Sequence, residues 1–353
     1  MNLENIYLLV FEITSHCNLK CPQCGRINTG ELAPHVNLKH WDVDQILPNL
    51  QIDQLSNLKY VHLEGDNGDA LMHPRLLDII DAFHNAPTAP DIGIWTNGAI
   101  RSEDWWFKFG QRYNTDRVRV QFSIDGLADT HKLYRVGADY DKAMANAKAF
   151  IQGGGKAGHR CLVFKHNEHQ LEDIVVFSKE IGFEYLTFML NDADRFNGNE
   201  SWPVYEKGAV THHIQSTTLT HDAVSQYNYN NASKKWPGRV EINDTETCIQ
   251  LKYGQLHITY KGHAIPCCIY NTHLYLDLPE NERFRTLVGD IDLIDLNKTS
   301  LSNVLSQGYF DRLNNMLKSK KDPGKCAYFC KGKLEFESDY ITGDVVLKTI
   351  TIK

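Results

Sequence analysis

Three cysteines lie close together near the N-terminus, in the run Thr14-Ser15-His16-Cys17-Asn18-Leu19-Lys20-Cys21-Pro22-Gln23-Cys24. Their Cys-x3-Cys-x2-Cys spacing lets one short loop hold an iron–sulfur cluster, and three thiolates on four irons leave one iron open for chemistry. A structural zinc site completed by His16 or by a distant cysteine is the main alternative, since Cys-x2-Cys pairs commonly bind zinc. A disulfide is disfavoured because the chain shows no secretory signal peptide.

The composition is that of a globular protein with a large core. The chain has 353 residues, 42% of them hydrophobic, and this length predicts about two domains or one large α/β domain with an appendage. No apolar run approaches the roughly 20 residues of a membrane span. The net charge of −7 and the lack of a basic tract argue against general nucleic-acid binding. Nine cysteines without a secretion signal suit a reducing cytosol, so we expect a cytoplasmic protein.

Short apolar segments alternate with amphipathic ones through the first half of the chain, which predicts parallel βαβ units and a sheet covered by helices. The first strand leads directly into the cysteine loop and would deliver it to one end of that sheet. The expected strands are Tyr7–Ile13, Lys59–Leu63, Asp91–Trp95, Arg117–Ile124, Arg160–Lys165 and Glu184–Leu190. The expected helices are Pro74–Phe83, Tyr140–Ile151 and Gln170–Ile181, the last one stopped by Gly182.

The strand followed by Cys-Asn-Leu-Lys-Cys-Pro-Gln-Cys resembles the cluster loop of radical S-adenosylmethionine (SAM) enzymes. In that family the open iron binds the amino and carboxylate groups of SAM, and reduction cleaves the sulfonium to a 5'-deoxyadenosyl radical. Later strand ends resemble the family as well. The matching stretches are Glu64 to Pro74, similar to its Gly-Gly-Glu-Pro loop with Leu-His-Pro, then Thr96-Asn97-Gly98, Ser123-Ile124-Asp125-Gly126, and His131 to Arg135, similar to its His-x-x-x-Arg.

The resemblance implies a set of SAM contacts at the carboxyl ends of the strands, where ligands of parallel sheets bind. Gly68 would let backbone approach the methionine moiety, Asp69 would meet the ammonium group and Arg135 the carboxylate. The full implied set is Gly68, Asp69, Asn97, Ser123, Asp125 and Arg135. The chain departs from the family pattern at Asn67, Asp69 and Ala70, and at Gln23, where an aromatic residue often packs on adenine.

A second cysteine group lies in the C-terminal part. Cys248, thirteen residues, Gly262, four residues and Cys267 resemble the opening of the auxiliary-cluster domains called SPASM and, in their one-cluster form, twitch. We expect a hairpin of Gln255–Tyr260 and Ala264–Cys268 turned at Gly262, then a helix from Leu301 to Lys318. One further 4Fe–4S cluster would be ligated by Cys248, Cys267, Cys326 and Cys330, and a four-cysteine zinc site is the alternative. Cys268 would face away from Cys267, and Cys161 would be a buried apolar residue.

The expected architecture is a partial (β/α)6 TIM-like barrel over residues 1–195, a linker or substrate-covering segment over 196–245, a small twitch domain over 246–335 and a tail over 336–353. The resemblance implies hydrogen abstraction from a substrate by the SAM-derived radical, with two 4Fe–4S clusters and a low-potential donor such as flavodoxin or ferredoxin. A peptide or protein is the expected substrate. The alternatives are a sugar- or nucleotide-like intermediate and, in a different class, a non-catalytic metal-binding or electron-transfer module.

Overall fold

The structure is a computed structural model that describes residues 1–191, 199–232, 240–241, 248–268, 285–286, 288–318, 334–339 and 344–349. Cys326 and Cys330 lie outside the described residues, so their assignment to an auxiliary cluster stays a prediction. None of the helices within these ranges combines the length and the apolar character that a membrane span needs.

One nine-stranded sheet organises the molecule, in the order β11-β8-β7-β6-β5-β4-β1-β13-β14. Neighbours from β13 through β1 to β8 are parallel, whereas β14 and β11 at its two ends are antiparallel to their neighbours. All six predicted strands are present, and the expected partial barrel is confirmed. The bounds are β1 (Leu8–Phe11), β4 (Tyr60–Leu63), β5 (Asp91–Thr96), β6 (Val118–Ser123), β7 (Lys156–Val163), β8 (Tyr185–Leu190), β11 (Tyr229–Asn230), β13 (Gln255–Ile258) and β14 (Ala264–Ile265).

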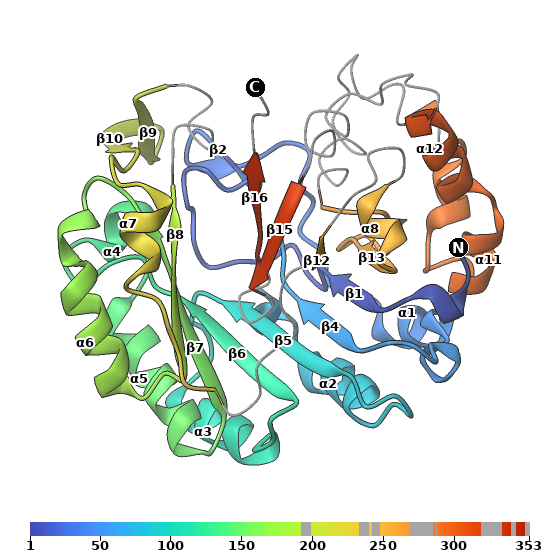
Figure 1. Ribbon diagram of the computed structural model, residues 1–353, viewed down its shortest axis with the longest axis horizontal. Helices are drawn as coiled ribbons and strands as arrows, with labels where there is room; N and C mark the ends of the chain where they lie inside the picture. Colours follow the sequence, from blue (N-terminus) through green and yellow to red (C-terminus); the bar gives the residue numbers. More distant parts are fainter. Residues whose placement is uncertain are drawn as a thin grey trace.

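Helices cover the outer side of the curved sheet (Figure 1). They are α1 (Val43–Leu50), α2 (Leu76–His84), α3 (Glu103–Arg112), α4 (His131–Tyr134), α5 (Tyr140–Gln152) and α6 (Leu171–Ile181). The Asp139 side chain caps α5 by accepting from the Lys142 N–H, and α6 ends as predicted at Gly182, whose φ is 96°. The sequence analysis did not predict α1 and α3. In α3, Trp106 and Phe109 pack against Phe150 of α5.

Alternation along the strands separates an apolar outer face from a polar inner face. On β6, Val118, Val120 and Phe122 belong to the main hydrophobic core under the helices. The residues between them, Arg119 and Gln121, therefore point to the inside of the partial barrel, as does Ser123. The inner face carries the groups available to a ligand.

The C-terminal hairpin of β13 and β14 forms as expected, but it is not separate from the barrel. β13 pairs in parallel with β1, with Leu8 opposite Gln255 and Phe11 opposite Ile258, so it adds a seventh parallel strand. The single helix expected from Leu301 to Lys318 is divided at Gly308, where φ is 68°, into α11 (Leu301–Ser306) and α12 (Tyr309–Lys318). A positive φ cannot be accommodated inside a helix, which is why the break falls there.

The segment expected as a linker or a substrate cover contains regular structure. A hairpin of β9 (Ser201–Glu206) and β10 (Ala209–Gln215) is followed by α7 (His221–Ser225) and by β11, which closes one edge of the sheet. Its described part is therefore packed on the barrel.

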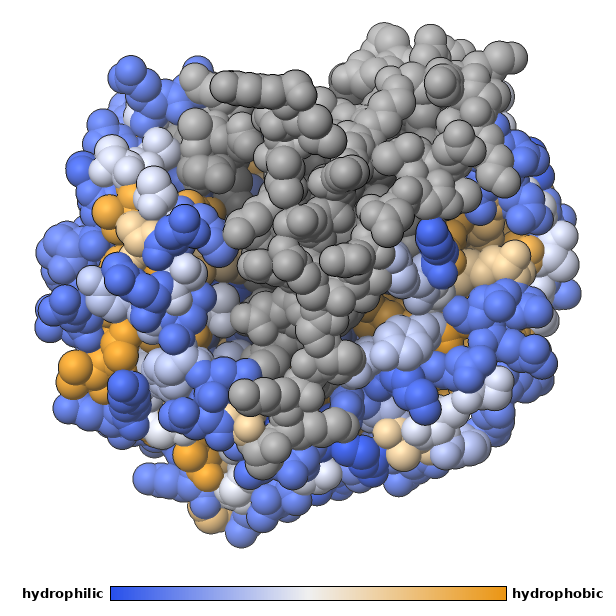
Figure 2. All heavy atoms as spheres, in the orientation of Figure 1, coloured by the Kyte–Doolittle hydropathy of each residue, from blue (hydrophilic) through white to orange (hydrophobic). Residues whose placement is uncertain are grey.

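Besides five 3-10 helices at Leu3–Asn5, Ile52–Gln54, Ala70–Met72, Glu168–Gln170 and Ile291–Ile294, the described part holds one further helix and two further small sheets. They are α8 (Ile249–Lys252), the pair β2 (Ile27–Asn28) and β3 (Glu31–Leu32), and the three-stranded sheet β12 (Val240–Glu241), β15 (Leu334–Asp339) and β16 (Asp344–Thr349). On the face shown in Figure 2 the described surface is mainly hydrophilic with scattered apolar residues, as is usual for the exposed surface of a folded domain.

Candidate functional site

The cysteine loop leaves the carboxyl end of β1 and brings its three thiols into one apolar cluster. Cys21 is 8% exposed and packs with Leu19 and Val136, and the partly buried Cys17 and Cys24 pack against the same cluster. Within the described ranges, no three His, Cys, Asp or Glu side chains are grouped as ligands of a single metal ion would be. The three predicted cysteines thus share one apolar cluster without being grouped around a single point.

Arg26 stabilises the conformation of this loop by hydrogen bonds to its backbone. Its guanidinium donates to the backbone carbonyls of Ser15 (3.0 Å), Leu19 (3.0 Å) and Cys17 (3.2 Å), and the residue is 8% exposed. One planar cation thus satisfies three carbonyls of the loop that lie outside any strand or helix.

The loop after β4 lies directly against the cysteine loop. The backbone N–H of Asp69 donates to the His16 carbonyl over 2.9 Å. A Cβ atom on Gly68 would lie 2.0 Å from the Thr14 carbonyl oxygen, so only glycine fits at this contact. Gly68 does permit a close backbone approach, and the approach seen here is to the protein's own loop. Its contact with SAM stays a prediction.

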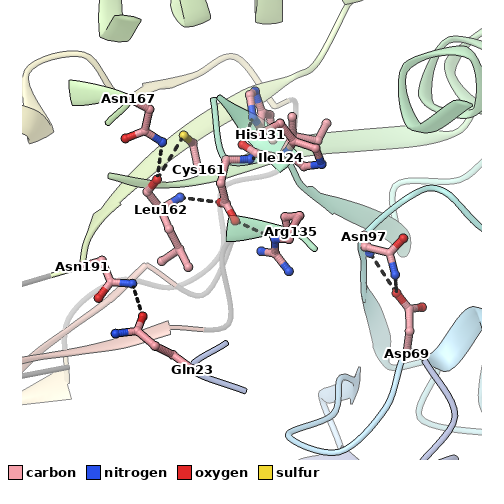
Figure 3. A network of polar contacts seen from close by, with 12 residues as sticks. Gln23, Asp69, Asn97, Ile124, His131, Arg135, Cys161, Leu162, Asn167 and Asn191 are labelled. Atoms are coloured by element: carbon pink, nitrogen blue, oxygen red, sulfur yellow. Dashed lines mark hydrogen bonds and ion pairs between the residues drawn. The ribbon is translucent and has the colours of Figure 1, made fainter. Parts of the chain in front are cut away.

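The Asp69 carboxylate accepts four hydrogen bonds from its own chain. Oδ1 accepts from the Leu71 N–H (3.0 Å), and Oδ2 accepts from the Thr96 hydroxyl (3.0 Å) and from both the backbone N–H and the side-chain amide of Asn97 (2.8 Å each). Figure 3 shows the Asp69–Asn97 pair. Burial raises the pKa of Asp69, and the bonds from Asn97, Leu71 and Thr96 oppose that rise.

Asn97 connects the end of β5 to the first cysteine. Its Nδ2 lies 2.8 Å from Asn18 Oδ1 and 3.8 Å from Cys17 Sγ, while its Oδ1 accepts from the Ala99 N–H over 3.0 Å. The Leu19 N–H also donates to Cys17 Sγ, over 3.4 Å. Two N–H groups thus face the sulfur of Cys17.

Arg135 and Asp125 form a buried pair beside the second cysteine. Arg135 Nε donates to Asp125 Oδ2 over 2.6 Å, and Asp125 Oδ1 accepts from the Leu162 N–H over 2.7 Å. Asp125 is fully buried, and Figure 3 shows Arg135 and Leu162 near each other. The Arg135 guanidinium also lies close enough to Cys21 to lower the pKa of its thiol. Ser123, at the end of β6, lies at the same carboxyl edge.

Burial raises the pKa of all three thiols, to about 12 for Cys17 and to about 11 for Cys21 and Cys24. The charge of Asp69 adds to the rise at Cys17, whereas the Arg135 guanidinium opposes it at Cys21. The free thiols are therefore protonated at neutral pH. A metal centre would displace these protons, since cysteine ligates a metal as the thiolate and not as the thiol.

Gln23 precedes the third cysteine, at a position that is often aromatic in the family that the cysteine loop resembles. Its Oε1 accepts a hydrogen bond from Asn191 Nδ2 over 2.8 Å, which joins the cysteine loop to the end of β8 (Figure 3). Asn191 is itself fully buried. Gln23 thus has a structural partner of its own.

Two of the four predicted auxiliary cysteines can be placed. Cys248 directly precedes the short helix α8 and Cys267 follows β14; they are 1% and 6% exposed and belong to the same hydrophobic core. Cys268 is exposed whereas Cys267 is buried, and the expectation that Cys268 faces away from Cys267 stays a prediction. Cys161 is fully buried among apolar residues of β7 and α6, as expected.

Sequence reasoning missed three groups at this edge of the sheet. Arg26 follows the third cysteine but belongs to no expected motif. Glu12, just after β1, is fully buried, accepts from the Asp66 N–H over 2.6 Å and lies 3.9 Å from His257 Nε2 on β13. A charged residue inside the otherwise apolar run before the loop was the available signal for Glu12. For His257 there was none, because its partner lies far away in the chain.

No protein-family model matches the chain, and no curated protein matches it. Among solved structures it is similar to Streptococcus suis SuiB bound to precursor peptide SuiA, with a TM-score of 0.58 and 14% identity over 90% of this chain and 68% of that chain. It is also similar to anSMEcpe with bound AdoMet, with a TM-score of 0.56 and 17% identity over 93% of this chain and 85% of that chain. At these identities the similarity establishes the shared fold.

Proposed function

We propose that this chain is a radical SAM enzyme that cleaves SAM reductively and abstracts a hydrogen atom from a substrate. One observation carries the proposal: the Cys17, Cys21 and Cys24 loop lies at the carboxyl edge of a partial parallel barrel and contacts the loops after β4, β5 and β6. Support also comes from the similar structures, since AdoMet is another name for SAM and is bound in anSMEcpe.

The three thiols fit an iron–sulfur cluster of which one iron is not held by protein. They share one apolar cluster, and burial keeps them protonated because a bare thiolate there would be desolvated. A metal centre that replaces the protons would compensate the charge of the thiolates. Arg26 already fixes the loop without the metal. When bound, the cluster supplies the electron that splits the sulfonium of SAM.

The residues at the strand ends would bind and orient SAM. Gly68 keeps the loop after β4 close to the cysteine loop, and Asn97 and Ser123 present polar groups at the carboxyl edge of the sheet. The Asp125–Arg135 pair supplies a fixed guanidinium for the carboxylate of SAM. The inner face of β6 below them would receive the substrate.

The C-terminal part would hold the auxiliary cluster through Cys248, Cys267, Cys326 and Cys330, as a one-cluster twitch domain over 246–335. The burial of Cys248 and Cys267 in one core supports this assignment. The cluster would accept an electron from the substrate radical or hold the substrate. A low-potential donor such as flavodoxin or ferredoxin would reduce the N-terminal cluster.

A peptide or protein is the substrate class that the similarities favour. SuiB was solved with the precursor peptide SuiA, and anSMEcpe with the Cp18Cys peptide, the latter at a TM-score of 0.51 and 17% identity over 93% of this chain and 88% of that chain. A sugar- or nucleotide-like intermediate is the competing substrate class.

The test is anaerobic reconstitution with iron and sulfide, followed by SAM and dithionite. We expect 5'-deoxyadenosine from the native chain and none from Cys17→Ala, Cys21→Ala or Cys24→Ala, while Cys161→Ala retains the product. An intact cluster that yields no 5'-deoxyadenosine would refute the proposal in favour of an electron-transfer module. About eight irons per chain would support two 4Fe–4S clusters, and about four irons with one zinc would make the C-terminal site structural.

A further inference from the structure

We propose that Asp69 is a positioning residue for the cluster and not a ligand of the SAM ammonium group. Through Asn97 it fixes the Cys17 side of the cluster, and its buried negative charge lowers the reduction potential there. The inference rests on the proposed function only in that Cys17 must ligate a cluster. It departs from what the family resemblance implies for the acid at this position.

The hydrogen-bond inventory of the carboxylate argues against a role toward SAM. A carboxylate has about two acceptor sites on each oxygen. Oδ2 of Asp69 accepts three hydrogen bonds, one from Thr96 and two from Asn97, and Oδ1 accepts one from Leu71. The residue is only 5% exposed. To bind an ammonium group through Oδ2, Asp69 would have to give up bonds that hold the turn after β5.

The same inventory directs Asn97 toward the cluster. Its Oδ1 accepts from the Ala99 N–H, which fixes Nδ2 on the side of Asp69, Asn18 and Cys17. The two amide hydrogens are shared among Asp69 Oδ2 (2.8 Å), Asn18 Oδ1 (2.8 Å) and Cys17 Sγ (3.8 Å). Asp69 therefore orients the amide that faces the sulfur of Cys17.

Two opposite electrostatic effects follow for a cluster bound at Cys17. An N–H group that donates to a ligating sulfur stabilises the more negative, reduced cluster and raises its potential. The buried Asp69 carboxylate, which lies beyond the Asn97 amide as seen from Cys17, repels the added electron and lowers the potential. Removing the charge of Asp69 and removing the amide of Asn97 should therefore shift the potential in opposite directions.

The experiment compares Asp69→Asn with the native full-length chain after anaerobic reconstitution. The midpoint potential of the N-terminal cluster is measured by EPR-monitored titration, and SAM affinity by equilibrium binding. We expect the potential of Asp69→Asn to rise by an amount equal to about a tenfold change in the reduction equilibrium, or about 59 mV for one electron. SAM affinity should change less than about threefold, because no contact to SAM is lost.

Asn97→Ser is the second variant. It removes the amide donor that faces Cys17 and leaves the charge of Asp69 in place, so the potential should fall. The matched control is Asp91→Asn, a buried aspartate at the opposite, amino-terminal end of β5, which should leave the potential unchanged.

A loss of SAM affinity of about tenfold or more in Asp69→Asn, with an unchanged potential, would overturn the inference and restore Asp69 as the ammonium ligand. Equal shifts of the same sign in both variants would also overturn it. If the native chain binds a cluster but forms no 5'-deoxyadenosine, the proposed function fails, while the potentials still decide the role of Asp69.

Discussion

The guanidinium of Arg26 is the single side chain on which the cysteine loop most depends. It spans three backbone carbonyls, and hydrogen bonds to a charged donor contribute about 1.5–3 kcal/mol each. We predict that Arg26→Gln lowers the iron content after reconstitution several-fold, because the loop loses at least about 2 kcal/mol of stabilisation. Arg26→Lys should behave similarly, since one ammonium group cannot reach all three carbonyls.

Iron and sulfide analysis of the purified chain measures this effect. Arg75→Gln is the matched control, since Arg75 is an exposed arginine that pairs with Asp44 and Asp78 at the surface. It should retain full iron content, because exposed ion pairs contribute little. Full iron content in Arg26→Gln would contradict the role given to Arg26.

Gln121, on the inner face of β6, has both side-chain amide atoms buried without a hydrogen-bond partner among the described residues, and the residue is 1% exposed. An unpaired buried amide costs about 1–3 kcal/mol, so Gln121 should lower the stability of the folded chain. Gln121→Met should therefore raise the free energy of unfolding by about 1–2 kcal/mol in a urea titration. Uncoupled formation of 5'-deoxyadenosine should be unchanged.

The comparison is with Asn167→Leu at a buried amide whose oxygen and nitrogen are both hydrogen-bonded. Asn167 accepts from the Phe164 N–H over 2.7 Å and donates to the Leu162 carbonyl over 2.9 Å, so this variant should be destabilised by about 2 kcal/mol or more. A destabilised Gln121→Met would show that Gln121 has a structural role instead.

Sequence reasoning at this scale predicted which residues gather but not what they do. Motif positions placed Gly68, Asp69 and Asn97 at one edge, and the structure brings Asp69 and Asn97 to Cys17. Two of the partners of Asp69, Thr96 and Asn97, come from a different strand end, and such pairings leave no mark in a local motif. Arg26 was missed for the same reason, because its three partners are backbone carbonyls.

Among the elements, the β9–β10 hairpin protects the cysteine loop. Val204 and Ile214 are buried in the apolar cluster that contains Cys21, and Trp202 packs against it. We predict that Ile214→Ser accelerates loss of the cluster's visible absorbance in air by several-fold, because burying a hydroxyl in place of an apolar side chain loosens this cover. Spectrophotometric bleaching after exposure to air measures the rate.

Val210→Ser on the same hairpin is the control, since Val210 is 45% exposed and lies outside that apolar cluster. It should bleach at the native rate. Equal acceleration in both variants would mean that the hairpin acts through its own stability and not by covering the loop.

Elements were predicted well where local periodicity decides them and poorly where pairing decides them. The six barrel strands and α2, α5 and α6 follow from apolar spacing, capping residues and Gly182. The hairpin of β13 and β14 was also predicted, but its parallel partner β1 lies near the opposite end of the chain. Nothing in the local sequence distinguishes a free hairpin from one that extends the barrel.

Across the whole molecule, buried neutral histidines are a shared feature. Burial lowers the pKa of His62 to about 3 and of His73, His131 and His159 to about 4. The neutral ring of His159 meets both of its partners, with Nε2 donating to the Ile124 carbonyl over 2.8 Å and Nδ1 accepting from the Ser178 hydroxyl over 2.5 Å. His257 differs: burial lowers its pKa, but Glu12, Asp66 and Glu64 together raise it more, so the net shift is upward.

These shifts predict that the protein loses stability in mild acid. The folded pKa values of the four histidines lie below the unfolded value of 6.5, so the unfolded chain binds more protons and the free energy of unfolding falls as the pH drops from 6.5 towards 4. Each contributes a loss of about 1 kcal/mol over the first pH unit below 6.5, and His257 opposes the trend because its raised pKa stabilises the folded state at low pH.

Urea midpoints of the anaerobic holoprotein and of the cluster-free chain, measured from about pH 7.5 to about pH 5, should fall together. His159→Gln should reduce the pH dependence of the urea midpoint by the contribution of one histidine. A midpoint that is constant over this range would contradict the burial of neutral histidines as the cause.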